Sequence, residues 1–213
     1  MEKLGNSMAK EKEQIDKLKF EKEEELKGNF LIAGVDEVGR GPLAGPVCVA
    51  AVIMPLDDLI DGVDDSKKLS EKKRNLLFEQ IKEKAICYHI EMVDEETIDK
   101  INILEATKLC MKKAIEGLSL RPDVVLIDAI SKLDTDVNLR GIIKGDALSY
   151  SIGCASILAK VTRDNLMVEL AKEYPEYGFE KHKGYGTKVH IEALKEHGPC
   201  VHHRLSFLKF LEK

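Results

Sequence analysis

Two adjacent acidic residues, Asp36 and Glu37, stand directly after an apolar run of β-compatible side chains, FLIAGV at residues 30–35. Carboxylates at the end of a buried strand are costly unless a positive group neutralises them. The loop that follows, GRGP at residues 39–42, is rich in turn formers and lets the backbone lie close against a ligand. The paired acids therefore indicate a bound metal cation, and an arginine between glycines indicates a polyanionic ligand.

The adjacency of Asp36 and Glu37 poses a geometric problem. Successive side chains of a regular strand point to opposite faces, so both acids can serve one site if the strand bends or bulges nearby. We expect that bulge at Gly34 or Gly39, where a distortion of the backbone costs least. The alternative is a loop that begins with two solvated acids.

Two further acids occupy comparable positions. Asp128 follows the wholly apolar residues 124–127 (VVLI), so it repeats the arrangement of an acid at the end of a buried strand. Asp164 lies between two valines on one face of an amphipathic helix expected over residues 151–172. Lys160 precedes Asp164 by one turn, and an ion pair between them is the alternative to a metal-binding role.

The four acids can meet only if the two strands lie side by side and the helix packs against the strand ends. A set of oxygen ligands without His or Cys favours Mg²⁺ or Mn²⁺ over zinc. Two such ions would hold the attacking water and the leaving oxygen while a phosphodiester is displaced in line. The acids therefore predict a two-metal hydrolytic site.

The apolar periodicity predicts an α/β protein that could position these acids. Four short apolar or alternating runs are expected strands, the first two joined as an antiparallel hairpin, and a fifth strand is expected near residues 142–146. Helices are expected where apolar residues recur at spacings of three and four, with Ser70 and Asp94 as N-caps. The expected strands cover residues 30–35, 47–54, 86–93 and 124–127, and the expected helices cover 70–85, 94–102, 103–118, 151–172 and 188–196.

The two ends of the chain differ from this pattern. Residues 1–28 are highly charged with a sparse apolar stripe that includes Leu26, which predicts a weakly docked surface helix without a catalytic role. Residues 174–213 are irregular and contain HKGYGT at 182–187. Tyr185, between two glycines on a basic loop, is expected to be exposed enough to stack on a sugar or base. The alternative is an aromatic ring tucked against the body of the protein.

The composition is that of a soluble globular protein, with 44% hydrophobic and 33% charged residues among 213. Lys and Arg number 33 against 38 Asp and Glu, so bulk charge does not predict nucleic-acid binding. No apolar run approaches the roughly 20 residues that span a bilayer. The five cysteines include no CxxC pair. We therefore expect a cytoplasmic protein with reduced thiols and no membrane association.

Four segments together resemble one known family. AGVDEVGRGPLAGPV at 33–47, DSKKLS at 65–70, SIGCASILAKVTRD at 151–164 and HKGYGT at 182–187 are similar to the signature segments of bacterial ribonuclease HII, a type 2 ribonuclease H. The resemblance implies a ribonuclease H-like α/β fold, with a mixed five-stranded sheet flanked by helices, over about residues 29–205. It divides the chain into an N-terminal extension (1–28) and a catalytic domain (29–213) that ends in a helical and loop extension from about residue 174.

The resemblance also implies a reaction and its partners. Members of this family cut the RNA strand of RNA–DNA hybrids, and they cut on the 5′ side of single ribonucleotides embedded in duplex DNA. The products carry 3′-hydroxyl and 5′-phosphate ends, and the reaction removes misincorporated ribonucleotides and primer RNA. We accordingly expect a monomer that uses two Mg²⁺ or Mn²⁺ ions and binds these two kinds of duplex.

The residues of the family's site match positions in this chain. The metal-binding and catalytic acids match Asp36, Glu37, Asp128 and Asp164. The expected substrate contacts are Gly39, Arg40 and Gly41 in the glycine loop, Lys67 in DSKKLS, and Tyr185. Further polar residues expected near the substrate are Ser66, Lys144, Ser156 and Lys183.

Two alternatives share some of these features. Ribonuclease HIII has the same acids, but it departs from Gly-Arg-Gly after the Asp-Glu pair and carries a larger N-terminal domain than the 28 or so residues present here. A protein that binds hybrids without cleaving them gains nothing from a group of acids that repels phosphate. Divalent-dependent cleavage separates an enzyme from this second alternative.

Overall fold

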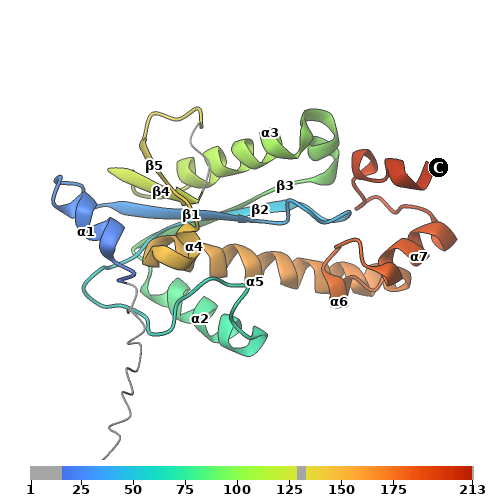
Figure 1. Cartoon of the computed structure of the whole chain (residues 1–213), viewed down its shortest axis with the longest axis horizontal. Helices are drawn as coiled ribbons and strands as arrows, with labels where there is room; N and C mark the ends of the chain where they lie inside the picture. The colour runs from blue at the N-terminus through green and yellow to red at the C-terminus, as the bar shows by residue number, and fades with distance from the viewer. Residues whose placement is uncertain (1–15, 129–132, 213) are drawn as a thin grey trace, which may run out of the picture.

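The structure, a computed structural model, describes residues 16–128 and 133–212. Its centre is a single five-stranded sheet with the strand order β3-β2-β1-β4-β5 (Figure 1). The strands are β1 (Ile32–Val38), β2 (Val47–Ile53), β3 (Cys87–Val93), β4 (Val124–Asp128) and β5 (Asn138–Ile142).

The sheet is mixed, as the sequence predicts. Strand β1 pairs antiparallel with β2, which pairs antiparallel with β3, so the expected hairpin is confirmed. On its other side β1 pairs parallel with β4, and β4 pairs parallel with β5. The ends of β1, β4 and β5 therefore lie at the same edge of the sheet, which is where the strand-end acids are found.

Helices cover both faces of the sheet (Figure 1). Helix α3 (Glu95–Glu116) lies on one face, and α5 (Tyr150–Glu173) lies on the other with α2 (Glu71–Lys84) packed against it. Successive side chains of a strand point to opposite faces, so each strand contributes to two apolar cores. In β2, the core on the α3 side includes Val47, Val49 and Ala51. The core on the α5 side includes Cys48, Ala50 and Val52.

Helix α5 lies unusually close to β1 at one point. A Cβ atom on Gly34 would come within 2.1 Å of the carbonyl carbon of Ser151, so only glycine permits this approach. Further along, a Cβ atom on Gly39 would come within 2.3 Å of the Arg163 side chain. Helix α5 thus runs beside β1 toward the glycine loop, and successive α5 residues face successive parts of the strand.

The helix caps confirm the expected starts of two helices. Ser70 accepts a hydrogen bond from the Lys73 amide at the start of α2, and Asp94 accepts one from the Thr97 amide at the start of α3. The two helices expected over 94–118 form one element with a kink at Asn102, whose φ is +67°. That position is the boundary between the two expected helices.

The fifth strand differs from the expectation. It covers Asn138–Ile142, whereas a strand was expected at 142–146; residues Gly145–Leu148 instead form the short helix α4. Lys144, with a left-handed φ of +59°, turns the chain out of the sheet between the two. The turn carries Asp146 into the space between the strand ends and α5.

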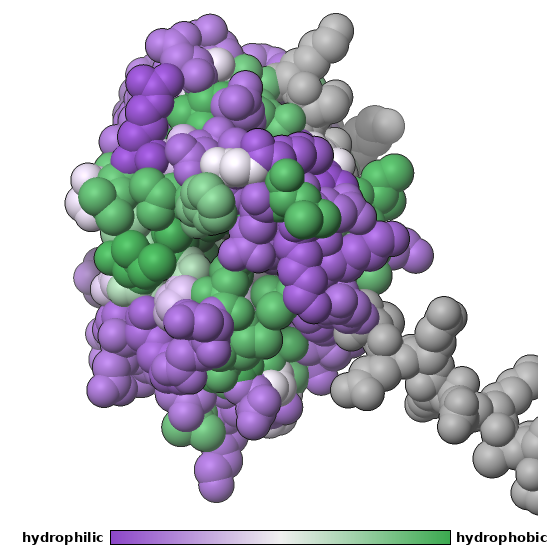
Figure 2. Space-filling model, turned by 90° about the vertical axis from the view of Figure 1, so that its left-hand side faces the viewer, coloured by the Kyte–Doolittle hydropathy of each residue, from purple (hydrophilic) through white to green (hydrophobic). Residues whose placement is uncertain are grey.

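The N-terminal segment is anchored by apolar and polar groups. Leu26, which follows helix α1 (Lys19–Glu25), is 89% exposed, whereas Leu18 and Phe20 pack against the apolar clusters. Glu21 is fully buried and accepts hydrogen bonds from the Ser149 hydroxyl and the Ser151 amide. Figure 2, which views the end of the molecule where α1 lies, shows apolar side chains among the polar ones.

The C-terminal segment packs at the other end of α5 (Figure 1). It consists of short helices around a small apolar cluster that includes Phe179 and Leu194. No helix of the described residues is long and apolar enough to cross a membrane. The elements of this segment are η1 (Pro175–Tyr177), α6 (Phe179–His182), α7 (Lys188–His197), η2 (Leu205–Phe207) and η3 (Lys209–Glu212).

Candidate active site

Asp36 and Glu37 both lie within β1, near its C-terminal end. The register with β2 continues regularly through Asp36↔Ala50 and Glu37↔Val49, so the bulge expected at Gly34 is wrong, whereas Gly39, with a φ of +94°, lies just beyond the strand. The two side chains therefore leave opposite faces of the strand. Asp36 is buried on the α5 side, where the Ser156 hydroxyl hydrogen-bonds to it, and Glu37 is half-buried on the other side.

Asp128 joins these acids because β4 ends there. In the parallel register Val35 of β1 lies opposite Ile127 of β4, so Asp128 follows at the level of Asp36. The negative charge of Asp128 raises the pKa of Glu37, so the two carboxylates are near each other. The end of β4 thus extends the acidic group from one strand to the next.

Asp146 is a fourth acid of this group, and it is absent from the sequence-based assignment. It lies in α4, is 8% exposed, and its charge raises the pKa of Asp36. A signal for it exists in the sequence. Asp146 follows the fifth strand closely, as Asp128 follows the fourth, and parallel strands bring such acids to one edge.

Burial, together with neighbouring carboxylates, raises the pKa values of three acids in this group. Burial raises the pKa of Asp36 well above its usual range, and the charges of Glu37 and Asp146 raise it further. Burial also raises the pKa of Glu37, against the effect of Arg40, whose Nη1 lies 3.5 Å from Glu37 Oε1. The pKa of Asp146 is raised by burial and by the charges of Asp65 and Asp128.

Lys67 is the basic residue that faces these acids. Its Nζ lies 4.0 Å from Asp146 Oδ2, and its side chain is 75% exposed. Burial lowers the pKa of Lys67, but the charges of Asp36 and Asp146 outweigh this effect and raise it overall. Lys67 and Arg40 are both largely exposed, so their charges offset the repulsion among the acids only in part.

The donor set fits a divalent metal ion with open coordination positions. No three His, Cys, Asp or Glu side chains among residues 16–128 and 133–212 converge closely enough to enclose an ion. Mg²⁺ is commonly bound by one or two carboxylates, with water and substrate phosphate completing the octahedron. Carboxylates at one edge of the sheet, of which Asp36 and Asp146 are buried, are the oxygen donors that such an ion needs.

Asp164 does not lie with the other acids. Its Oδ1 lies 2.7 Å from the Nζ of Lys160, one turn earlier on α5. This ion pair is the alternative to metal binding that the sequence left open. Eight residues separate Asp164 from Ser156, the α5 residue that contacts Asp36, and this spacing is about 12 Å along a helix. Asp146, and not Asp164, is therefore the acid that lies with Asp36 in the structure.

The glycine loop and Tyr185 lie side by side. A Cβ atom on Gly41 would be 3.6 Å from Tyr185 Cε1, so the ring covers this glycine. Tyr185 is 43% exposed, and Arg40 and Gly41 are exposed as well. The ring therefore packs against the glycine loop on one side and is exposed to solvent on the other. Each of the two alternatives from the sequence, a tucked ring and an exposed ring, is thus correct in part.

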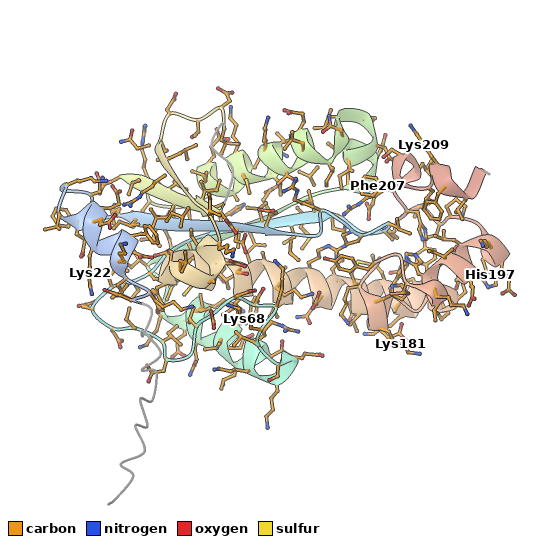
Figure 3. All side chains as sticks on the ribbon, in the orientation of Figure 1. Lys22, Lys68, Lys181, His197, Phe207 and Lys209 are labelled. Carbon is orange, nitrogen blue, oxygen red and sulfur yellow. The ribbon has the colours of Figure 1, made fainter. Side chains whose placement is uncertain are left out.

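The remaining candidate residues fall into two groups. Ser66 and Ser156 share a 2.9 Å hydrogen bond beside Asp36, and both are buried. Lys144 is exposed two residues before Asp146, whereas Lys183 lies at the far end of α6 with its ammonium directed to the Glu180 carbonyl. Figure 3 shows Lys68, next to Lys67, beside α5 in the middle of the molecule, and Lys181 and His197 toward the C-terminal end.

Comparison with known proteins places this geometry in a family. The family model of ribonuclease HII matches residues 33–210. The chain is 58% identical to a ribonuclease HII of Caldicellulosiruptor bescii over 192 residues, which cover 89% of this chain and 93% of the relative.

Solved structures agree with this match. Ribonuclease H2 of Pyrococcus horikoshii OT3 is 28% identical with a TM-score of 0.70, and the match covers 83% of this chain and 93% of that one. Bst ribonuclease HIII in complex with Mn²⁺ shares the fold at 20% identity and a TM-score of 0.64, over 80% of this chain and 63% of that one.

The matches decide between the two type 2 enzymes considered above. Relatives named ribonuclease HII reach 52–58% identity over most of the chain, whereas the ribonuclease HIII match is confined to the level of the fold. The Gly-Arg-Gly loop and the four segments quoted from the sequence lie within or overlap the matched residues. The chain therefore belongs to the ribonuclease HII family, endonucleases that hydrolyse RNA in RNA–DNA hybrids.

Proposed function

We propose that this protein cuts the RNA strand of hybrids, and the 5′ side of single ribonucleotides in duplex DNA, with two Mg²⁺ or Mn²⁺ ions at Asp36, Glu37, Asp128 and Asp146. The observation that carries the proposal is the placement of these acids at one edge of the sheet, where burial and neighbouring carboxylates raise the pKa values of Asp36, Glu37 and Asp146. Such mutual repulsion is unfavourable in the free protein and is relieved by a bound cation.

The surroundings of Asp36, Glu37 and Asp146 indicate how these acids would hold the ions. When bound, the ions would activate water and offset the charge on the scissile phosphate. Asp36 is fixed from the α5 side by the Ser156 hydroxyl, which is itself hydrogen-bonded to Ser66. Glu37 and Asp146 lie at the open edge of the sheet. The side chain of Lys67 is exposed beside Asp146, so its ammonium group can contact a phosphate of the substrate there.

Recognition of the ribonucleotide is assigned to the glycine loop and Tyr185. The sugar of RNA differs from that of DNA by the 2′-hydroxyl, which is both a donor and an acceptor. Gly39 and Gly41 let backbone groups approach that hydroxyl, and the loop begins two residues beyond Glu37. Tyr185 would stack on the neighbouring deoxyribose, where an added hydroxyl would be crowded.

The cellular setting follows from the same reaction. Cleavage at single ribonucleotides suits the removal of misincorporated ribonucleotides and of primer RNA. We propose that the protein acts in the cytoplasm. We also propose that it acts as a monomer, because all residues of the site come from one chain. Its binding partners would be the two kinds of duplex.

The test is cleavage of two end-labelled substrates, a long RNA–DNA hybrid and a duplex with one ribonucleotide. Activity should be absent with a chelator and restored by Mg²⁺ or Mn²⁺, because the proposed ligands are all carboxylates. The single ribonucleotide should be cut on its 5′ side, leaving a 3′-hydroxyl. Binding without cleavage under every divalent ion would instead support the non-catalytic alternative.

A further inference from the structure

Two arginines are completely buried beneath the glycine loop. Arg163 lies on α5 and Arg204 follows α7, and both side chains are 0% exposed. Arginine is rarely buried to this extent unless it is paired. What these guanidinium groups bind therefore calls for an explanation.

Arg163 donates to three backbone carbonyl groups. Its Nε lies 2.8 Å from the Pro46 carbonyl oxygen and its Nη2 lies 2.9 Å from that of Ala44. Its Nη1 lies 3.0 Å from the carbonyl oxygen of Lys183, two residues before Tyr185. One side chain thus ties the glycine loop to the loop that carries the tyrosine.

Arg204 holds the other half of the glycine loop. Its Nη2 lies 2.6 Å from the Gly39 carbonyl oxygen, and its Nη1 lies 3.0 Å from that of Arg40. Its Nε and Nη2 both reach the Gly45 carbonyl oxygen. The guanidinium also lies over the ring of Phe207, 5.2 Å from its centroid, and Phe207 is labelled in Figure 3.

The glycines of the loop make room for these side chains. A Cβ atom on Gly39 would lie 2.3 Å from Arg163 Nε, and one on Gly45 would lie 2.9 Å from Arg163 Nη2. Both glycines have positive φ values, +94° and +85°. The loop sequence and the two arginines are therefore parts of one arrangement.

The arrangement fixes which way the loop presents its polar groups. The carbonyls of Gly39, Arg40, Ala44, Gly45 and Pro46 are taken up by the arginines beneath. Within the described residues, the amide groups of Arg40 and Gly41, both exposed residues, donate to no acceptor. The exposed surface of the loop thus keeps amide donors for an anion or a sugar hydroxyl.

The buried arginines also place positive charge under this surface. In the hydrogen bonds of the described residues, both guanidiniums donate to carbonyl oxygens and to no carboxylate. Burial lowers the pKa of Arg163, and burial together with Arg163 lowers the pKa of Arg204 to about 9. Both groups remain charged at pH 7, and a charge acts more strongly where water is excluded.

We propose that Arg163 and Arg204 are positioning residues for ribonucleotide recognition: they shape the 39–46 loop, join it to Tyr185 and lend positive charge to its outer face. The inference rests on the proposed function. It would also concentrate positive charge under one loop of a chain whose formal net charge is −5, with Glu95 and Asp99 as the acids that act on Arg204.

Four substitutions test the proposal: Arg163→Lys, Arg204→Lys, Arg163→Gln and Arg204→Gln. Lysine keeps the charge but loses the planar fork that holds several carbonyls at once, whereas glutamine also loses the charge. Arg140→Gln is the matched control, because Arg140 is a partly buried arginine that pairs with Glu23 and Glu24 far from the loop. Folding is checked by circular dichroism and thermal unfolding.

The first readout is the ratio of kcat/KM on a one-ribonucleotide duplex to kcat/KM on a long hybrid. Each lysine variant should lower this ratio by about tenfold or more, since a small misplacement of a recognition loop has effects of that size. The control should leave the ratio unchanged. The second readout is duplex binding with a chelator present, which the glutamine variants should weaken more than the lysine variants.

Three results would overturn the proposal. The first is folded lysine variants with the wild-type ratio and wild-type binding, and the second is an equal change of the ratio in Arg140→Gln. The third is failure of both lysine variants to fold, which would show that the two arginines stabilise the whole domain rather than position the loop. Failure of the proposed function is a separate result, because the wild-type protein itself would then cleave neither substrate.

Discussion

Asp36 is the residue on which the acidic group places the greatest electrostatic strain. It is 6% exposed, and its pKa is raised well above the usual range by burial, then by Glu37 and Asp146. An acid whose pKa is higher in the folded than in the unfolded state stabilises the fold most at low pH. That stabilisation is lost as the pH rises from about the ordinary Asp value of 3.8 through the raised folded value.

Asp36→Asn should therefore stabilise the metal-free protein at pH 7, by roughly 1–3 kcal/mol, the usual range for single substitutions. The gain should shrink as the pH falls toward 4, because the wild-type carboxyl then becomes neutral too. Chemical denaturation in the presence of a chelator, from pH 4 to pH 8, measures the difference between the two proteins. A variant less stable than wild type at pH 7 would contradict the repulsion.

At the residue scale, the sequence is enough to find three of the four acids but not Asp146. Asp36, Glu37 and Asp128 follow or interrupt apolar strands, which is a visible pattern. Asp146 was hidden because residues 142–146 read as a strand, whereas Lys144 turns the chain into α4. The position of Asp164 between valines, and the resemblance of its helix segment, favour a metal-site acid, whereas the structure shows its ion pair with Lys160.

At the scale of elements, α1 has a larger part than its sequence predicts. Glu21 is buried at the N-terminus of α5, where it accepts from the Ser149 hydroxyl at 2.6 Å and from the Ser151 amide at 3.0 Å. A carboxylate at this end of a helix is favoured by the unpaired amides and the helix dipole. Lys17 extends the contact to Asp64 at 2.6 Å, beside the 65–68 loop.

Glu21→Gln should lower the free energy of unfolding by about 1–2 kcal/mol, the size of a partly buried charge–dipole interaction at a helix end. Glu25→Gln, an exposed acid on the same helix, is the control and should change it by less. Urea denaturation monitored by circular dichroism compares the variants. Equal effects of the two substitutions would show that the buried carboxylate has no special part in anchoring α1.

Helices and strands are predicted correctly from the sequence where their limits depend on neighbouring residues. The starts of α2 and α3 depend on Ser70 and Asp94, whose side chains cap amides three residues away. The regular pairing of β1 with β2 depends instead on the whole sheet, so the expected bulge could not be judged from Gly34. The role of Gly34 is to admit the backbone of α5, a long-range contact.

At the scale of the molecule, the fold separates two functions along α5. Near its N-terminal half, α5 contacts the acids through Ser156; near its C-terminal half, it supports the glycine loop through Arg163. One rigid helix therefore sets the spacing between the hydrolytic group and the loop that is proposed to recognise the sugar. That spacing is a property of the helix and does not depend on either loop.

We propose that Asp146 belongs to the catalytic acids and that Asp164 does not. The most direct measurement is the rate of hybrid cleavage by Asp146→Asn and Asp164→Asn, side by side in saturating Mg²⁺. We predict that Asp146→Asn loses several orders of magnitude in rate, while Asp164→Asn loses at most about 1 kcal/mol of stability with its ion pair and stays near the wild-type rate. The reverse order of rates would contradict the site described.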